Sequence, residues 1–210
     1  EFRRVLFRSE STARLQVSPI ARADGKALFT LRVDNLTGHK FPTGYPARRA
    51  VLHVQVLRGR EVVFESGSFD ERGRLAGVAD ELAVPHVRTV TDPRDVVVYE
   101  MVAGDADGKP VTSLTAMARK LKDNRLLPAG WRADGPHVEA TAPAGVDGDE
   151  DFRGGSDTVA FAVPIGEGRG RLSVRAELRY QAVPPAWVDG LRGVDDDACR
   201  RSEEHASELQ

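Results

Sequence analysis

Apolar and polar residues alternate along several stretches of this sequence, most regularly from Leu172 to Tyr180. Successive side chains of a β-strand point to opposite faces, so a period of two predicts a strand with one buried and one solvated face. Antiparallel sheets that cover a single core carry this pattern. The apolar members of the stretch, which we expect to face inward, are Leu172, Val174, Ala176, Leu178 and Tyr180.

The same alternation recurs often enough to predict the fold class. It is clear over 26–33 and 50–57, and shorter β segments are expected at 13–20, 61–65, 82–90, 96–102, 137–141 and 158–163. Only one segment has helical spacing, with apolar residues at i, i+3, i+4 and i+7: Leu114, Met117, Ala118 and Leu121. We therefore expect an all-β, antiparallel β-sandwich, immunoglobulin-like or jelly-roll-like, with one short α-helix and long loops.

Composition excludes several classes of protein. The 210 residues include 30 Lys+Arg, 32 Asp+Glu and 40% hydrophobic residues, which is enough apolar mass for one domain and too balanced for a dedicated nucleic-acid binder. No apolar run approaches the roughly 18 residues that span a bilayer. Cys199 is the single cysteine, so the chain has no internal disulfide, no cysteine-based zinc site and no C-x-x-C-H motif for covalent haem attachment.

The two ends of the sequence read as translated sequencing adapters. Residues 1–9 are EFRRVLFRS and residues 201–210 are RSEEHASELQ, with Ala206 departing from the usual adapter reading. Such scars do not belong in a fold argument, so His205 is not a ligand candidate. We expect one β-sandwich domain over 10–200, cut from a longer gene product. Cys199 is then either a lone thiol or the first residue of a truncated haem-attachment motif.

A loop rich in glycine and proline follows the predicted strand at 26–33. It reads NLTGHKFPTGYP over 35–46, and its expected scaffold residues are Asn35, Gly38, Pro42 and Gly44. A histidine on such a stiff loop, His39, has a fixed direction, as an axial or metal ligand needs. The alternative is that His39 bonds a neighbouring carbonyl and closes the loop.

Three further histidines have weaker signals. His86 follows Val84-Pro85 at a break in a β segment. It is either half-exposed beside a kinked strand or a second nitrogen ligand, if the fold brings it to His39. His53 and His137 are expected on a sheet face or at the surface.

Carboxylates alternate at the start of 147–157 as they do in calcium-binding loops. The match to an EF-hand then fails, because Phe152 replaces the turn glycine and Thr158 the bidentate glutamate. A different calcium site remains open, against a solvated acidic loop, with Asp147, Asp149, Asp151 and Asp157 as candidate ligands. The chain contains no nucleophile elbow, phosphate-binding glycine loop or H-E-x-x-H motif, so we expect no enzymatic activity from it alone.

Several motifs in fixed order resemble the C-terminal β-rich domain of bacterial multihaem c-type cytochromes. They extend over most of Gln16 to Trp187 and read NLTGHKFPTGYPARRAVLHVQV, VVFESG, VPH, KDNRLLPAGW, DEDFRGGSDTVAFAV and VRAELRYQAV. Val84 departs from that family, which more often has an acidic residue before the Pro-His pair. The resemblance implies His39 and His86 as candidate axial ligands.

The resemblance also implies a role and a compartment. The chain would be a haem-free accessory domain, with haem c in the parent protein and electron transfer in the periplasm or elsewhere outside the cytoplasm. Its partners would be the haem domains of the same polypeptide and other redox proteins, and the parent could be a redox enzyme. The competing hypothesis is a calcium-stabilised β-sandwich module that binds a polysaccharide or a protein.

Overall fold

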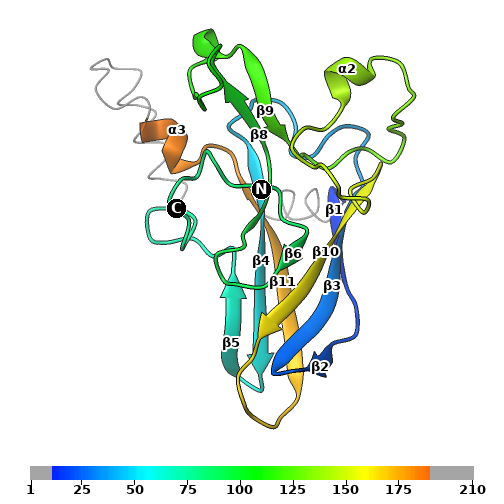
Figure 1. Ribbon diagram of the computed structural model, residues 1–210, viewed down its shortest axis with the longest axis vertical. Helices are drawn as coiled ribbons and strands as arrows, with labels where there is room; N and C mark the ends of the chain where they lie inside the picture. The colour runs from blue at the N-terminus through cyan, green and yellow to red at the C-terminus, as the bar shows by residue number, and fades with distance from the viewer. Residues whose placement is uncertain (1–10, 190–210) are drawn as a thin grey trace.

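The computed structural model describes residues 11–189. Two facing sheets form the body of the molecule, and long loops and a separate hairpin lie at one end (Figure 1). The first sheet has the order β1-β3-β10-β6 with β2 on β3: β1 (Ala13–Val17), β2 (Ala21–Ala23), β3 (Lys26–Asn35), β6 (Thr89–Val90) and β10 (Ser156–Pro164). The second has the order β11-β4-β5 with β7 on β4: β4 (Arg49–Arg58), β5 (Glu61–Ser66), β7 (Val97–Tyr99) and β11 (Leu172–Gln181).

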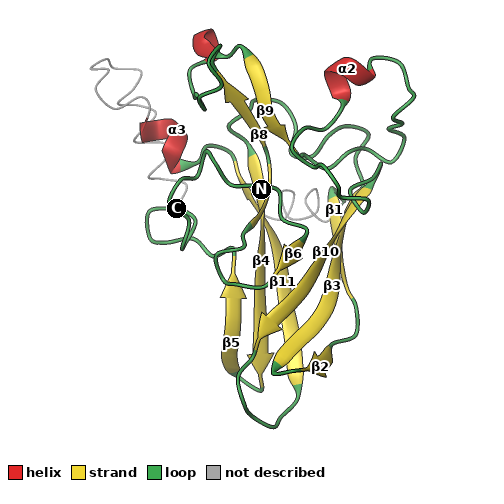
Figure 2. Cartoon of the chain, viewed as in Figure 1, coloured by secondary structure: helices red, strands yellow, loops and turns green. Residues whose placement is uncertain are grey.

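The remaining elements are short. A hairpin consists of β8 (Met101–Gly104) and β9 (Arg119–Asp123), and the helical segments are a 3-10 turn (Leu114–Ala116), α2 (Val138–Thr141) and α3 (Pro185–Asp189). All strand pairs are antiparallel except β6 with β10, which is parallel. The mostly β architecture confirms the predicted fold class (Figure 2). No helix within residues 11–189 is long and apolar enough to cross a membrane. The two predicted adapter segments and Cys199 lie outside the described residues.

The main core lies between the two sheets, where the period-two pattern places it. Alternate residues of β3 from Ala27 to Val33 are buried, and Phe29 stacks on Phe161 of β10 with ring centroids 4.7 Å apart. Strand β4 is buried on both faces, because a second apolar cluster covers its outer side: Val51, Leu75, Val84, Val96 and Val98. His53 lies on that outer side but is buried, with Nε2 2.7 Å from Glu65 Oε1.

An ion pair is buried where the long connection after β5 crosses the second sheet. Arg49 Nη2 donates to Glu81 Oε1 at 2.8 Å, and the same oxygen accepts the backbone N–H of Leu75 at 2.7 Å. Arg49 Nε donates to Gln181 Oε1, also at 2.8 Å. The pair thereby fixes the connection to β4 and to the end of β11.

Gly67, directly after β5, has φ +74°, and a Cβ there would overlap the carbonyl oxygen of Leu52. We expect Gly67→Ala to lower the free energy of unfolding by about 2 kcal/mol, because strain at positive φ adds to steric overlap. Gly59→Ala is the matched control, since Gly59 has φ +63° and open space around its Cβ. It should cost about 1 kcal/mol in the same urea titration. Equal losses for the two variants would rule out a contribution from the overlap.

Four sequence predictions are wrong. The expected helix from Thr112 is only the 3-10 turn, and the chain then enters β9; directly before this strand, Ala118 N donates to Gly104 O at 2.8 Å. The expected strand at 137–141 is α2, and of 82–90 only β6 is a strand. Tyr180, expected to face inward, is 53% exposed. In the first case pairing with β8 outweighs the local helical spacing.

Candidate functional site

Asn35, at the end of β3, holds the loop that carries His39. Its side chain is buried, and Nδ2 donates to the carbonyl oxygens of His39 at 2.8 Å and Leu126 at 3.0 Å. Its Oδ1 accepts the backbone N–H of Thr37 at 2.9 Å. Asn35 thus hydrogen-bonds backbone groups of its own loop and of the segment that follows β9, and it fixes the loop against that segment.

Further contacts fix the same loop to residues 123–126. Phe41 and Leu126 exchange two backbone hydrogen bonds of 2.9 and 2.8 Å. Lys40 Nζ lies 2.7 Å from Asp123 Oδ2, and Arg125 binds both oxygens of Asp123. Burial alone would raise the pKa of Asp123, but hydrogen bonds from Arg125 and Lys40 outweigh burial and lower it. The Asp123 carboxylate is therefore ionised at neutral pH, while burial lowers the pKa of its partner Lys40.

The predicted scaffold residues of this loop differ in what they do. The Phe41–Pro42 peptide bond is cis, and Gly44 has φ +80° beside Arg48, whose Nη1 donates to Thr43 O at 3.0 Å. Gly38 has open space around it and no positive φ. Asn35, Pro42 and Gly44 have identifiable conformational roles, whereas nothing in the structure explains the glycine at 38.

His39 is exposed, and of its two ring nitrogens only Nδ1 has a hydrogen-bond partner among residues 11–189. Nδ1 lies 3.0 Å from the carbonyl oxygen of Lys40, which can only accept, so Nδ1 carries the proton. Nε2 has no hydrogen-bond partner among residues 11–189 and keeps its lone pair. Metal-binding histidines are held in this way, with the second ring N–H donated to a carbonyl or carboxylate. The predicted bond to a neighbouring carbonyl and a ligand role are thus compatible.

His86 belongs to a different, buried cluster that does not include His39. Its Nε2 lies 2.8 Å from Asp149 Oδ2, its Nδ1 lies 3.1 Å from Asn124 Nδ2, and its ring packs edge-on against Phe152. A ring nitrogen of His86 lies close to one carboxylate oxygen of Asp149 and one of Asp157. These three atoms are all within 4.8 Å of one another. The structure thus brings together three predicted site residues from two separate predictions.

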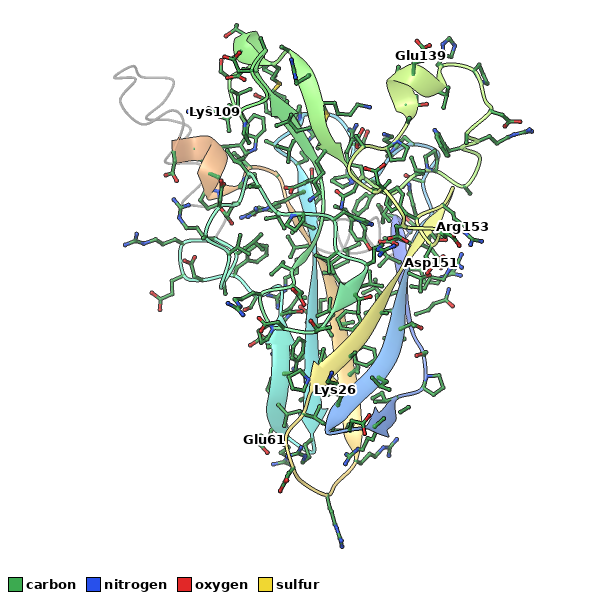
Figure 3. All side chains as sticks on the ribbon, viewed as in Figure 1. Lys26, Glu61, Lys109, Glu139, Asp151 and Arg153 are labelled. Carbon is green, nitrogen blue, oxygen red and sulfur yellow. The ribbon has the colours of Figure 1, made fainter. Side chains whose placement is uncertain are left out.

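The other two predicted calcium ligands, Asp147 and Asp151, are exposed and lie outside this cluster as far as residues 11–189 are concerned. Asp151, labelled in Figure 3, lies near β10. It borders an open hollow of about 340 Å³. The four carboxylates therefore do not converge on one point.

Asn124 determines which nitrogen of His86 carries the proton. Its Oδ1 accepts the backbone N–H of Glu100 at 2.9 Å and its Nδ2 donates to Val98 O at 2.7 Å, which fixes the amide orientation. The second N–H of this amide therefore points to His86 Nδ1, and Nε2–H donates to Asp149. A metal ion or haem iron at Nε2 would have to displace this proton. Nδ1 of His86 is poorly placed to receive that proton, because it faces the N–H of Asn124.

Asp157, on β10, is fully buried and has no charged donor in the described part of the chain. Tyr99 OH donates to its Oδ2 at 2.8 Å, and its Oδ1 has no hydrogen-bond partner there. Burial raises the pKa of Asp157 to about 6; the Asp149 carboxylate adds to the rise, while the hydrogen bond from Tyr99 opposes it. Burial also raises the pKa of Tyr99 well above its ordinary value, so the phenol remains a donor.

Neither Tyr99 nor Asn124 was predicted from the sequence. Tyr99 lies in an apolar β segment, and Asn124 lies within the KDNRLLPAGW motif without a separate signal. Their roles depend on contacts with residues 24 to 58 positions away. Only the assembled fold reveals them.

Comparisons with known proteins yield one similar structure. The chain is similar to a penta-heme cytochrome c552 from Thermochromatium tepidum, with a TM-score of 0.48 and 17% sequence identity. The alignment covers 87% of this chain and 35% of that chain, so the chain spans about a third of that protein's length. No family model matches the sequence, and no curated protein matches it.

Proposed function

We propose that this chain is the haem-free accessory domain of a multihaem c-type cytochrome that functions outside the cytoplasm. The domain packs its His39 loop against a haem-bearing part of the same polypeptide. His39 Nε2 is the axial ligand of one haem there, and the domain shields the haem edge from water. The domain has no enzymatic activity of its own.

The state of His39 is the observation that carries this proposal. An axial ligand needs an accessible lone pair on a ring of fixed orientation. The bond from Nδ1 to the Lys40 carbonyl supplies the tautomer, and Asn35 holds the backbone of the loop. Motifs in the order typical of the cytochrome domain surround this histidine in the sequence.

Apolar side chains on the same loop also support docking. Leu36 and Tyr45 are each 43% exposed, and Tyr45 contacts Trp187 of α3 edge-on at 5.3 Å. Exposed apolar groups beside a ligand histidine are suited to exclude water from a porphyrin edge. An axial ligand and a dry haem edge both tune reduction potential.

The calcium-stabilised binding module draws less support from the site. Two of its four predicted ligands, Asp147 and Asp151, are exposed and do not belong to the described cluster of His86, Asp149 and Asp157. The other two are held against His86 and Tyr99.

The test is His39→Ala in the parent polypeptide. The reading frame around this sequence is expected to encode C-x-x-C-H motifs. In that protein His39→Ala should convert one haem per polypeptide from low-spin to high-spin and change one midpoint potential, as seen by electron paramagnetic resonance and a redox titration. His137→Ala is the matched control, because His137 is also exposed but lies at the start of α2.

Two results would contradict the proposal. An intact reading frame without any C-x-x-C-H motif would exclude the cytochrome role. Unchanged spectra and potentials in His39→Ala would exclude the ligand role and leave only packing against the haem domain.

A further inference from the structure

Within residues 11–189, strand β11 forms a long free edge of the second sheet. Among these residues its ten members pair only with β4, and β1 packs near it across the sandwich without pairing with it. In Figure 1, β11 and β5 flank β4 on opposite sides. A free edge presents a row of unpaired N–H and C=O groups that can bind another strand.

The edge of β11 has few of the features that usually prevent such pairing. Its register with β4 is continuous from Leu172 to Gln181, without a bulge, a proline or a charge pointing inward. The opposite edge strand, β5, has six residues and an irregularity in its pairing with β4. Of the two edges of this sheet, β11 is the one suited to accept a strand.

We propose that two copies of this chain associate by pairing β11 with β11, antiparallel, about a two-fold axis at Ala176. In this register Arg175 faces Glu177 of the second copy, and the symmetry repeats this pair. On the core-facing side Val174 faces Leu178 and Leu172 faces Tyr180. Opposite charges and apolar side chains placed directly across antiparallel strands stabilise the pairing.

The charge pattern selects this register over its neighbours. A two-fold axis perpendicular to a sheet can pair only side chains that lie on the same face. The nearest alternative axes are therefore one residue away along the strand, in either direction. An axis at Glu177 would place Glu177 against its own copy and Arg175 against Arg179. An axis at Arg175 would place two copies of Arg175 together. Like charges directly opposite each other destabilise a strand pair.

Burial on β11 is consistent with a missing neighbour. Its core-facing residues Leu172, Val174, Ala176 and Leu178 are only partly buried, although they pack against the main core, and Tyr180 is 53% exposed. A second β11 would cover this open flank of the sandwich. Both copies would use the same surface, as an isologous dimer requires.

Charge reversal tests the register in the full chain. Wild type is expected to show twice the monomer mass in sedimentation at high concentration and to dissociate on dilution. Arg175→Glu and Glu177→Arg should each weaken association at least about tenfold, since each creates two like-charge contacts. The double variant carrying both changes should restore it. The matched control is Glu61→Arg on β5, which should leave association unchanged (Figure 3).

Each alternative result overturns the proposal. A wild-type chain that stays monomeric at millimolar concentration excludes the dimer. Dimers that persist in both single variants, or a folded double variant that stays monomeric, exclude this register. A dimer broken by Glu61→Arg assigns the interface to β5. Circular dichroism of each variant separates loss of association from loss of folding. None of these results depends on His39 or on haem.

Discussion

Glu81→Ala is expected to lower the free energy of unfolding by about 3–5 kcal/mol, the largest effect that we expect from a single side chain. Arg49 is 1% exposed, and Glu81 Oε1 is its one anionic partner among residues 11–189. Without that carboxylate the guanidinium remains buried with only Gln181 and the ring of Phe69, 5.9 Å away, beside it. The Leu75 N–H loses its acceptor as well.

Removing both charges should cost far less than removing one. Replacing a buried ion pair by apolar side chains of similar size is often close to neutral, because the desolvation penalty of the charges disappears with them. Arg49→Met combined with Glu81→Leu should therefore recover most of the stability lost in Glu81→Ala. The cost of the single variant reflects an uncompensated charge rather than a strong bond.

Urea unfolding followed by circular dichroism measures both effects. Glu71→Ala is the matched control, because Glu71 is an exposed glutamate in the same connection and should change stability by less than about 0.5 kcal/mol. A loss below 1 kcal/mol in Glu81→Ala would show that Arg49 finds water or another partner. A double variant as unstable as the single one would show that the side chains, not their charges, hold the connection.

The strands were predictable because their signal is local. The period of two over 26–33, 50–57 and 172–180 appears as β3, β4 and β11. Strands β3 and β11 begin at the predicted residue and end slightly later, and β4 is slightly longer at both ends. The helical spacing of Leu114, Met117, Ala118 and Leu121 was local too, yet it failed. Backbone pairing of β9 with β8 satisfies the hydrogen bonds that a helix would have made, and tertiary contacts override weak helix propensity.

The candidate site residues each had a signal in the sequence, but the sequence did not show which of them lie together. His86, Asp149 and Asp157 each had a signal, but His86 and Asp149 lie 63 positions apart, and only the packing of the long loops joins them. Proximity of this kind leaves no periodicity in a sequence. The contacts within the His39 loop are local instead, because Asn35, Thr37 and His39 interact within a few residues of one another.

Asp157→Asn is expected to stabilise the protein at neutral pH, by up to about 3 kcal/mol at pH 7. Burial raises the pKa of Asp157 from its ordinary 3.8 to about 6. Between these values the folded state binds more protons than the unfolded state, so the contribution of this group to stability falls as pH rises and is lowest above pH 6. An amide keeps an acceptor for Tyr99 OH without a charge to ionise.

The pH dependence separates this mechanism from a general change in packing. The free energy of unfolding is measured in urea at pH 4, 5, 6 and 7. Asp157→Asn and wild type should differ little at pH 4, and the variant should become more stable relative to wild type with each step to higher pH. Asp147→Asn, a matched exposed aspartate from the same segment, should run parallel to wild type throughout. A constant offset between Asp157→Asn and wild type at every pH would contradict a raised pKa. A variant less stable than wild type at pH 7 would mean that the ionised carboxylate has a partner, such as a bound cation, that the amide cannot replace.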